Sequence, residues 1–130
     1  MQTNSLFDSF DNGALAVPGK EKDFSSLPWN AHPTFPGVAL KHLVTGGETG
    51  GLFSYHLVRI EPGKRIGKHI HDPQLETHEV IDGRGGCRNG ESELRYKPGV
   101  ISIFPSGVTH EVTAEETGLL LFAKFMPPLC

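Results

Sequence analysis

Three histidines and one glutamate in this sequence have the types and spacing of a metal-binding set. His69 and His71 are two residues apart, so in a strand both imidazoles face the same side. Glu76 follows the turn signal Asp72-Pro73, which lets the chain return toward the same point, and His110 is the candidate fourth ligand. Two or three imidazoles with one carboxylate suit a divalent transition metal, namely Fe, Mn, Ni, Cu or Zn.

Glycines and a proline frame these candidate ligands at fixed distances. The first stretch reads G-x5-H-x-H-x4-E-x6-G, and the second reads G-x5-P-x-G-x2-H. This double pattern resembles the two sequence motifs of the cupin superfamily. One position differs, because the family often has Asn four residues after the last His and this sequence has Ala114. The matching positions are Gly63, His69, His71, Glu76 and Gly83 in the first motif and Gly99, Pro105, Gly107 and His110 in the second.

The resemblance extends over residues 37–126, which is most of the chain. It implies one metal ion inside a small β-barrel, held by His69, His71, Glu76 and His110. The Asn that is missing is not usually a ligand, so the implied metal set is unaffected. The fold hosts many reactions, and the resemblance therefore does not specify one.

The whole chain has the length and composition of a single β-rich domain. It has 130 residues with 16 Gly and 10 Pro, and no segment has a convincing helical period. About nine short strands between turns predict an all-β, double-stranded β-helix (jelly-roll) barrel over residues 37–130. The expected strands are 38–44, 52–60, 65–71, 75–82, 85–88, 92–96, 100–104, 108–113 and 119–125.

Residues 1–36 are expected to form an N-terminal arm. Prolines and glycines interrupt this segment every few residues, yet it carries seven large apolar side chains, too many for a disordered tail. We expect the arm to pack on the outer face of the barrel or on a partner subunit. Trp29 is interpreted as a packing anchor. Together with the resemblance to small cupins, the arm predicts a homodimer.

Further polar residues are candidates for acid, base or substrate-anchoring roles. Alternation along residues 54–60 favours an inward His56, and His78 shares a strand face with Glu76. Tyr55 and Tyr96 are additional candidates. For His78 the alternative is a hydrogen-bonded core histidine. So many imidazoles near one cavity predict an anionic or hydroxylated small-molecule ligand.

Charge and hydropathy exclude several classes of function. The net charge is −3 with a pI near 6.1, and scattered Lys and Arg residues argue against nucleic-acid binding. The longest apolar run, residues 119–123, is too short to span a bilayer, and no signal peptide is apparent. Two cysteines make a poor disulfide framework. We therefore expect a cytoplasmic protein with no membrane or nucleic-acid partner.

The leading hypothesis is a metal-dependent enzyme that acts on a small organic molecule in the barrel cavity. A dioxygenase-like oxidoreductase with Fe is preferred. A metal-dependent lyase or isomerase is one alternative. The other is a non-catalytic small-molecule-binding or sensing module, which would need a separate partner to act on DNA, because 130 residues leave no room for a helix-turn-helix.

Overall fold

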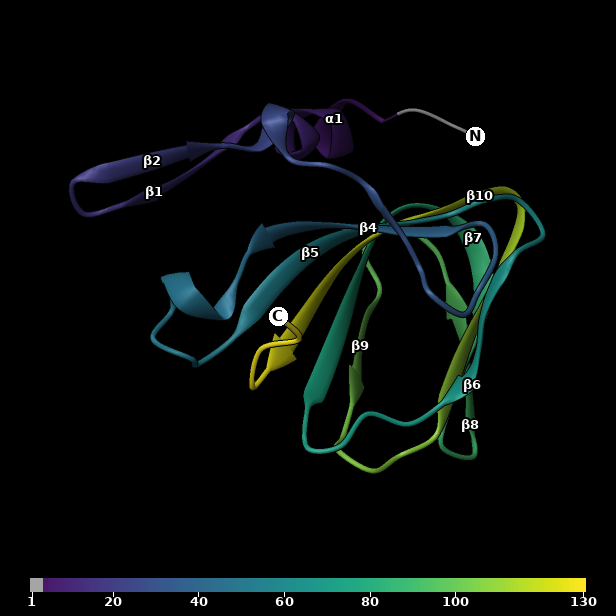
Figure 1. Cartoon of the computed structure of the whole chain (residues 1–130). Coiled ribbons are helices and arrows are strands. Elements are labelled where there is room, and N and C mark those ends of the chain that lie inside the picture. Colours follow the sequence, from purple (N-terminus) through teal and green to yellow (C-terminus); the bar gives the residue numbers. More distant parts are fainter. Residues whose placement is uncertain (1–3) are drawn as a thin grey trace.

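The structure is a computed structural model, and it describes residues 4–130. An antiparallel barrel is formed by strands β3 to β10, and the N-terminal arm lies against its outside (Figure 1). The predicted all-β jelly-roll architecture is confirmed. The elements are α1 (Ser5–Asp11), β1 (Ala14–Val17), β2 (Lys20–Asp23), η1 (Phe24–Ser26), β3 (Asn30–Ala31), β4 (Val38–Val44), η2 (Gly46–Glu48), β5 (Ser54–Ile60), β6 (Arg65–His69), β7 (Leu75–Asn89), β8 (Ser92–Tyr96), β9 (Ile101–Phe104) and β10 (His110–Met126).

Two long strands, β7 and β10, connect the parts of the barrel. β10 pairs with β5, β6 and β7, and its register with β7 shifts between Ala114 and Leu119. At this crossing the backbones come too close for side chains. Gly83 has a φ of +98°, and a Cβ there would lie 2.0 Å from the carbonyl oxygen of Gly118. The framing glycine of the first motif is therefore required by this close approach.

The same crossing explains a difference from the predicted strands. The sequence predicts separate strands at 75–82 and 85–88, and at 108–113 and 119–125. In the structure each pair is one continuous strand, β7 and β10 respectively. The glycines around position 83 do not separate two strands, because they allow close packing within one long, bent strand.

Apolar side chains are buried on both faces of β10. Leu119 and Leu121 belong to the cluster inside the barrel, while Leu120 and Phe122 belong to a second cluster between the sheet and the arm. Successive residues of a strand point to opposite faces, so a strand that is covered on both sides must be apolar throughout. The arm thus seals the outer face of its own barrel, with Phe7 as one of its fully packed residues.

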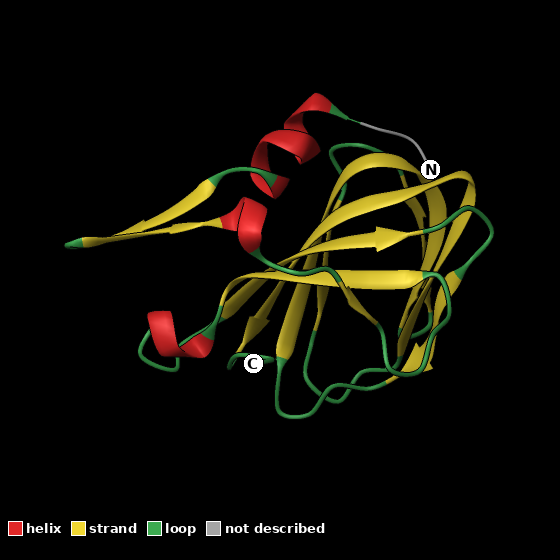
Figure 2. Cartoon of the chain, turned by 45° about the horizontal axis from the view of Figure 1, so that its top comes forward, coloured by secondary structure: helices red, strands yellow, loops and turns green. Residues whose placement is uncertain are grey.

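The arm contains more regular structure than its sequence suggests. The side chain of Asn4 caps helix α1 by accepting hydrogen bonds from the backbone N–H groups of Leu6 and Phe7, at 3.0 and 3.1 Å. Helices α1 and η1 lie over the sheet, and the β1–β2 hairpin extends away from the barrel (Figures 1 and 2). Among residues 4–130, no helix is both long enough and apolar enough to cross a membrane.

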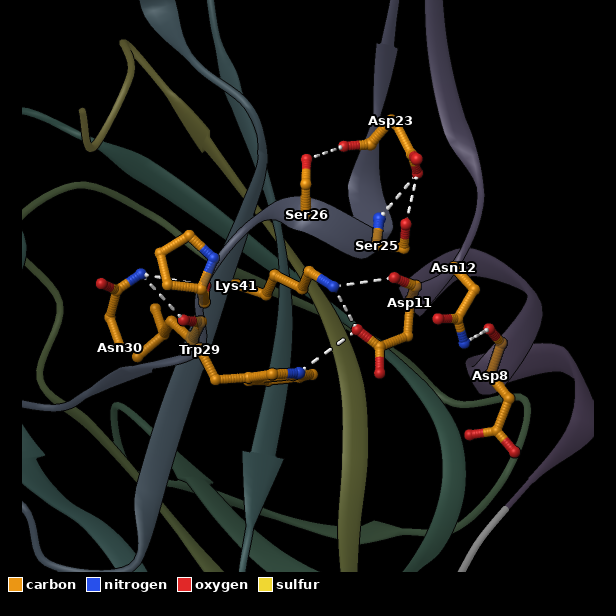
Figure 3. Close-up of polar contacts among 11 residues, drawn as sticks. Asp8, Asp11, Asn12, Asp23, Ser25, Ser26, Trp29, Asn30 and Lys41 are labelled. Carbon is orange, nitrogen blue, oxygen red and sulfur yellow. Dashed lines mark hydrogen bonds and ion pairs between the residues drawn. The ribbon is translucent and has the colours of Figure 1, made fainter.

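A buried lysine attaches the arm to the barrel (Figure 3). Lys41 in β4 is only 3% exposed, and its Nζ lies 2.5 Å from Oδ1 of Asp11 and 2.7 Å from the Asp11 carbonyl oxygen. The indole N–H of Trp29 donates to the same Oδ1 at 3.2 Å, and the Arg59 guanidinium lies 4.2 Å from the centre of the indole ring. Trp29 is thus a packing anchor in the structure.

The end of the arm joins the barrel sheet. Strand β3 pairs with β4, with Asn30 opposite Leu40 and Ala31 opposite Ala39. This pairing leads the next residue, His32, to the mouth of the barrel cavity. The arm therefore contributes to the cavity as well as to the outer face.

Candidate metal centre and cavity

The structure brings together the four side chains that the sequence predicts as metal ligands. One ligand atom from each of His69, His71, Glu76 and His110 lies within 4.8 Å of all the others, and we call this group the His3Glu cluster. The Nε2 atoms of His69 and His71 are 3.2 Å apart. Oε1 of Glu76 lies 3.4 Å from Nε2 of His71 and 3.1 Å from Nε2 of His110.

Strand pairing and two loop contacts set this convergence. His69 in β6 and His110 in β10 are direct partners across the two strands. The turn after His71 is tied to the loop of the second motif, because Gly107 N–H donates to the His71 carbonyl at 2.9 Å. Ser106 Oγ also donates to Asp72 at 3.2 Å. The two motifs are thus held against each other by hydrogen bonds.

Backbone carbonyls orient two of the imidazoles. Nδ1 of His69 is 2.7 Å from the Gly67 carbonyl oxygen, and Nδ1 of His110 is 3.3 Å from that of Val108. A carbonyl oxygen can only accept, so each Nδ1 carries the hydrogen and each Nε2 turns a lone pair toward the cluster. A metal-binding histidine usually donates a hydrogen bond from the nitrogen that does not bind the metal. His69 and His110 both have such a partner, a backbone carbonyl.

Two buried atoms of the cluster have no hydrogen-bond partner among residues 4–130. They are Oε1 of Glu76 and Nε2 of His110. Because Nδ1 of His110 carries the hydrogen, the 3.1 Å contact between these two atoms joins an acceptor to an acceptor. Buried polar atoms without partners are costly, and a cation that both atoms coordinate would satisfy them. The donor set therefore fits a divalent transition metal.

His78 and Tyr96 support the glutamate from behind. Nε2 of His78 is 2.8 Å from Oε2 of Glu76, and Nδ1 of His78 is 3.0 Å from the Tyr96 hydroxyl. A carboxylate oxygen accepts, so Nε2–H donates to Glu76 and Nδ1 accepts the tyrosine O–H. Both side chains are almost fully buried. They leave Oε1 as the oxygen that faces the imidazoles.

The pKa shifts of His69, His71 and Glu76 favour the protonation states that a metal ion requires. Burial lowers the pKa of His69 and His71 from the usual histidine value. Burial alone would raise the pKa of Glu76, but the neighbouring His78, which donates a hydrogen bond to Oε2, outweighs it and holds the pKa of that carboxyl well below its usual range. Neutral imidazoles and a charged carboxylate are the forms that bind metal.

Three members of the cluster, His69, His71 and Glu76, line a cavity of about 300 Å³. Its wall is largely apolar, with contributions from Leu40, Val58 and Phe125. His32 from the arm also lines it, and its Nδ1 accepts hydrogen bonds from the N–H groups of Thr34 and Phe35 at 3.1 and 3.2 Å. Nε2 of a neutral His32 must then carry the hydrogen and is available as a donor.

His56 faces inward, as the alternation along its strand predicts, but it is not a member of the His3Glu cluster. It is fully buried, with Nδ1 2.8 Å from Nδ1 of His42 and Nε2 2.7 Å from Ser54 Oγ. Burial, and secondarily the neighbouring His42, lowers the pKa of His56 to about 4. Tyr55 lies on the opposite face of β5, where its ring contacts Phe122 outside the barrel. The structure therefore does not bring Tyr55 to the site.

Three residues that the sequence did not suggest contribute to this region. His32, His42 and Cys130 all line the cavity. His42 could have been found from the pairing of β4 with β5, because it lies directly opposite His56. The positions of His32 and Cys130 depend on the path of the arm and of the C-terminal residues, for which the sequence has no local signal.

Comparisons with known proteins agree with the fold. Solved structures that share it include KdgF from Halomonas sp. (19% identity, TM-score 0.68, 79% of this chain and 90% of that one). A predicted oxalate decarboxylase from Thermotoga maritima is also similar, with 21% identity and a TM-score of 0.69 over 79% of this chain and 95% of that one. Ectoine synthase from P. lautus has 20% identity and a TM-score of 0.66 over 77% of this chain and 70% of that one. A search of curated protein sequences found no match. The family model described as Cupin domain matches residues 56–123, slightly more than half of the sequence, and the chain belongs to this family.

Proposed function

We propose that the protein is a metal-dependent enzyme that acts on a small organic molecule in the barrel cavity. The observation that carries this proposal is the contact between Oε1 of Glu76 and Nε2 of His110. Both atoms are buried acceptors that lack a hydrogen-bond partner within residues 4–130, and Glu76 lines the cavity together with His69 and His71. A cation at this point would be reachable by a small molecule in the cavity.

The residues around the cavity favour a molecule with oxygen at its polar end. His32 has a free Nε2–H donor, because both hydrogen bonds at its Nδ1 come from the backbone. The apolar wall, including Leu40 and Val58, suits a short carbon skeleton. His78 holds the glutamate in place and does not need to contact the molecule. We therefore propose a small carboxylate or hydroxylated compound as substrate.

A dioxygenase-like oxidation with Fe(II) is the reaction class that we propose. His69, His71, Glu76 and His110 would hold the ion, which would supply redox or Lewis-acid chemistry to a molecule in the cavity. A metal-dependent lyase or isomerase reaction is the alternative. It is favoured by two proteins of the same fold, a predicted oxalate decarboxylase and an ectoine synthase.

The test is turnover by the metal-free protein after loading with Fe(II) or with Zn(II). A panel of small carboxylates and hydroxy acids would be incubated in air and under nitrogen, with oxygen uptake and substrate loss measured together. We expect oxygen-dependent substrate loss with Fe(II), absent in Glu76→Gln and retained in Tyr55→Phe, the control on the outer face. Turnover with Zn(II) under nitrogen would contradict the proposed oxidation and support the lyase or isomerase alternative. If the protein binds one of these compounds but turns over none of them under any condition, the enzyme proposal is wrong and the protein is a binding module.

A further inference from the structure

A second group of metal-binding side chains lies at the same cavity, which two of its members, His42 and Cys130, line. His42, His56 and Cys130 each place one ligand atom within 4.8 Å of the other two. None of the three belongs to the His3Glu cluster. Nδ1 of His42 and Nδ1 of His56 face each other at 2.8 Å. We call this group the His2Cys cluster.

The sheet holds the two imidazoles in place. His42 in β4 and His56 in β5 are direct partners across the strands, and their rings meet edge to face at 4.9 Å. Nε2 of His56 is 2.7 Å from Ser54 Oγ, a hydrogen bond that fixes the ring from its far side. When Nε2–H donates to this hydroxyl, Nδ1 of His56 has a lone pair toward His42.

Backbone contacts hold the cysteine beside these imidazoles. Leu129 N–H donates to the same Ser54 Oγ at 2.8 Å, and Gly46 N–H donates to the Cys130 carbonyl oxygen at 2.7 Å. Pro128 packs directly on Gly46, where a Cβ would lie 2.8 Å from the proline ring. The thiol is therefore placed by the fold beside the two imidazoles, while Cys130 remains accessible to solvent.

We propose that His42, His56 and Cys130 form a second metal site, selective for a thiophilic ion such as zinc. Two imidazoles and one thiolate make a softer donor set than three imidazoles and one carboxylate. Atoms bound to one tetrahedral zinc ion lie about 3–4 Å apart, given metal–ligand distances of about 2.0–2.3 Å. The three ligand atoms lie within 4.8 Å of one another, and Cys130, which is exposed, is the member whose side chain is least restrained by packing.

This second site goes beyond the proposed enzymatic function and has a different consequence. Leu129 and Cys130 form part of the cavity wall. A zinc ion shared by β4, β5 and Cys130 would fasten residues 127–130 to the wall of the cavity. The site would thus shape the wall that a substrate meets, while the His3Glu cluster holds the reactive ion.

Metal titration of the untagged, metal-free protein tests the proposal. Cobalt(II) serves as the spectroscopic probe, since a cobalt–thiolate bond gives a near-ultraviolet charge-transfer band, and zinc gives the stoichiometry. We expect two zinc equivalents and a thiolate band in the unchanged protein. Cys130→Ser should bind one equivalent without the band. Cys87→Ser, the matched control at the buried cysteine, should retain two equivalents and the band.

Glu76→Gln separates this proposal from the enzymatic one. It should lose the equivalent at the His3Glu cluster and retain the thiolate band. A protein that binds only one equivalent, with the band present and unchanged in Glu76→Gln, would support the second site and contradict the first. Absence of the thiolate band in the unchanged protein, or its persistence in Cys130→Ser, would contradict the second metal site. His42 and His56 would then be a hydrogen-bonded pair without a metal-binding role.

Discussion

Nε2 of His78 lies 2.8 Å from Oε2 of Glu76, so one carboxylate oxygen is used in a hydrogen bond and the other faces the three imidazoles. The Tyr96 hydroxyl continues this chain at the far nitrogen of His78. The carboxylate cannot rotate without breaking a buried hydrogen bond, which would cost about 1–3 kcal/mol. His78 is therefore a positioning residue for the glutamate.

His78→Phe is expected to weaken metal binding about 10–100-fold. The phenyl ring preserves the bulk but removes the donor to Glu76, so the carboxylate loses its fixed orientation and an unpaired Oε2 is left buried. Affinity would be measured by competition with a chromophoric chelator. Tyr96→Phe should have a smaller effect, since it removes only the more distant hydrogen bond. Unchanged affinity together with a raised Tm would mean that His78 is a core residue without a role at the site.

The stability of the metal-free protein should fall as the pH decreases from 7 to 5, partly because of His56. Its pKa is lowered from the usual value of 6.5 to about 4 in the folded protein, mainly by burial. The unfolded chain therefore binds a proton more readily in this range, and protonation favours unfolding. The stabilisation from a neutral His56 is complete above pH 6.5 and is lost as the pH falls toward 4. The expected loss between pH 7 and pH 5 is about 2 kcal/mol.

Urea denaturation at the two pH values would measure this effect in protein kept free of metal with a chelator. Other histidines with lowered pKa also contribute, so the decisive quantity is the difference between the unchanged protein and His56→Gln. The variant should lose about 2 kcal/mol less over the same interval. Equal losses in the two proteins would show that His56 is not kept neutral by its burial.

The barrel and the metal ligands were predictable because their signals are local. His69, His71 and Glu76 belong to one short stretch, and a period of two with a turn is enough to bring them together. The predicted boundaries of β4 and β8, residues 38–44 and 92–96, are those of the structure. Each of these strands ends at a Gly-containing turn or at a proline, where sequence and backbone geometry agree.

The surroundings of the metal ligands could not be predicted in the same way. Tyr55 and His56 are adjacent in the sequence and point to opposite faces of β5, and both faces are covered by apolar residues. Alternation alone therefore favours an orientation but does not show which residues line the cavity. His42 meets His56, and Cys130 meets both, only after the register and the path of the chain beyond β10 are fixed. These are long-range relationships without a local sequence pattern.

Removal of the Asp11 carboxylate should destabilise the protein more than its position in the arm suggests. Asp11→Ala leaves the ammonium of Lys41 buried with the backbone carbonyl of residue 11 but without a carboxylate, and the expected loss is about 2–3 kcal/mol, reduced by the partial exposure of Asp11. The double variant Asp11→Ala/Lys41→Met should recover most of this loss, because no buried charge remains. Urea denaturation of the two variants would measure both effects. A loss that persists in the double variant would assign the stability to the contacts of Asp11 with Trp29.

The homodimer remains a prediction, and the β1–β2 hairpin is the part of the arm that we expect to form its interface. The hairpin extends away from the barrel (Figure 1), and its Leu15 and Val17 share one face that is only partly covered within the chain. A lone two-stranded hairpin is marginally stable in water at best, so a second subunit on this face would stabilise it. The rest of the arm is occupied with sealing its own barrel.

Excision of the hairpin is expected to convert the dimer into a folded monomer. Phe24 N–H donates to the Gly13 carbonyl at 2.8 Å, so a short linker can replace residues 14–23 without moving α1 or η1. Leu15→Glu is the matched variant that keeps the hairpin but places a charge on the predicted interface. Light scattering should give the mass of two chains for the unchanged protein and of one chain for both variants, with the circular dichroism of the barrel retained. A monomeric unchanged protein, or a dimer that survives both changes, would contradict this interface.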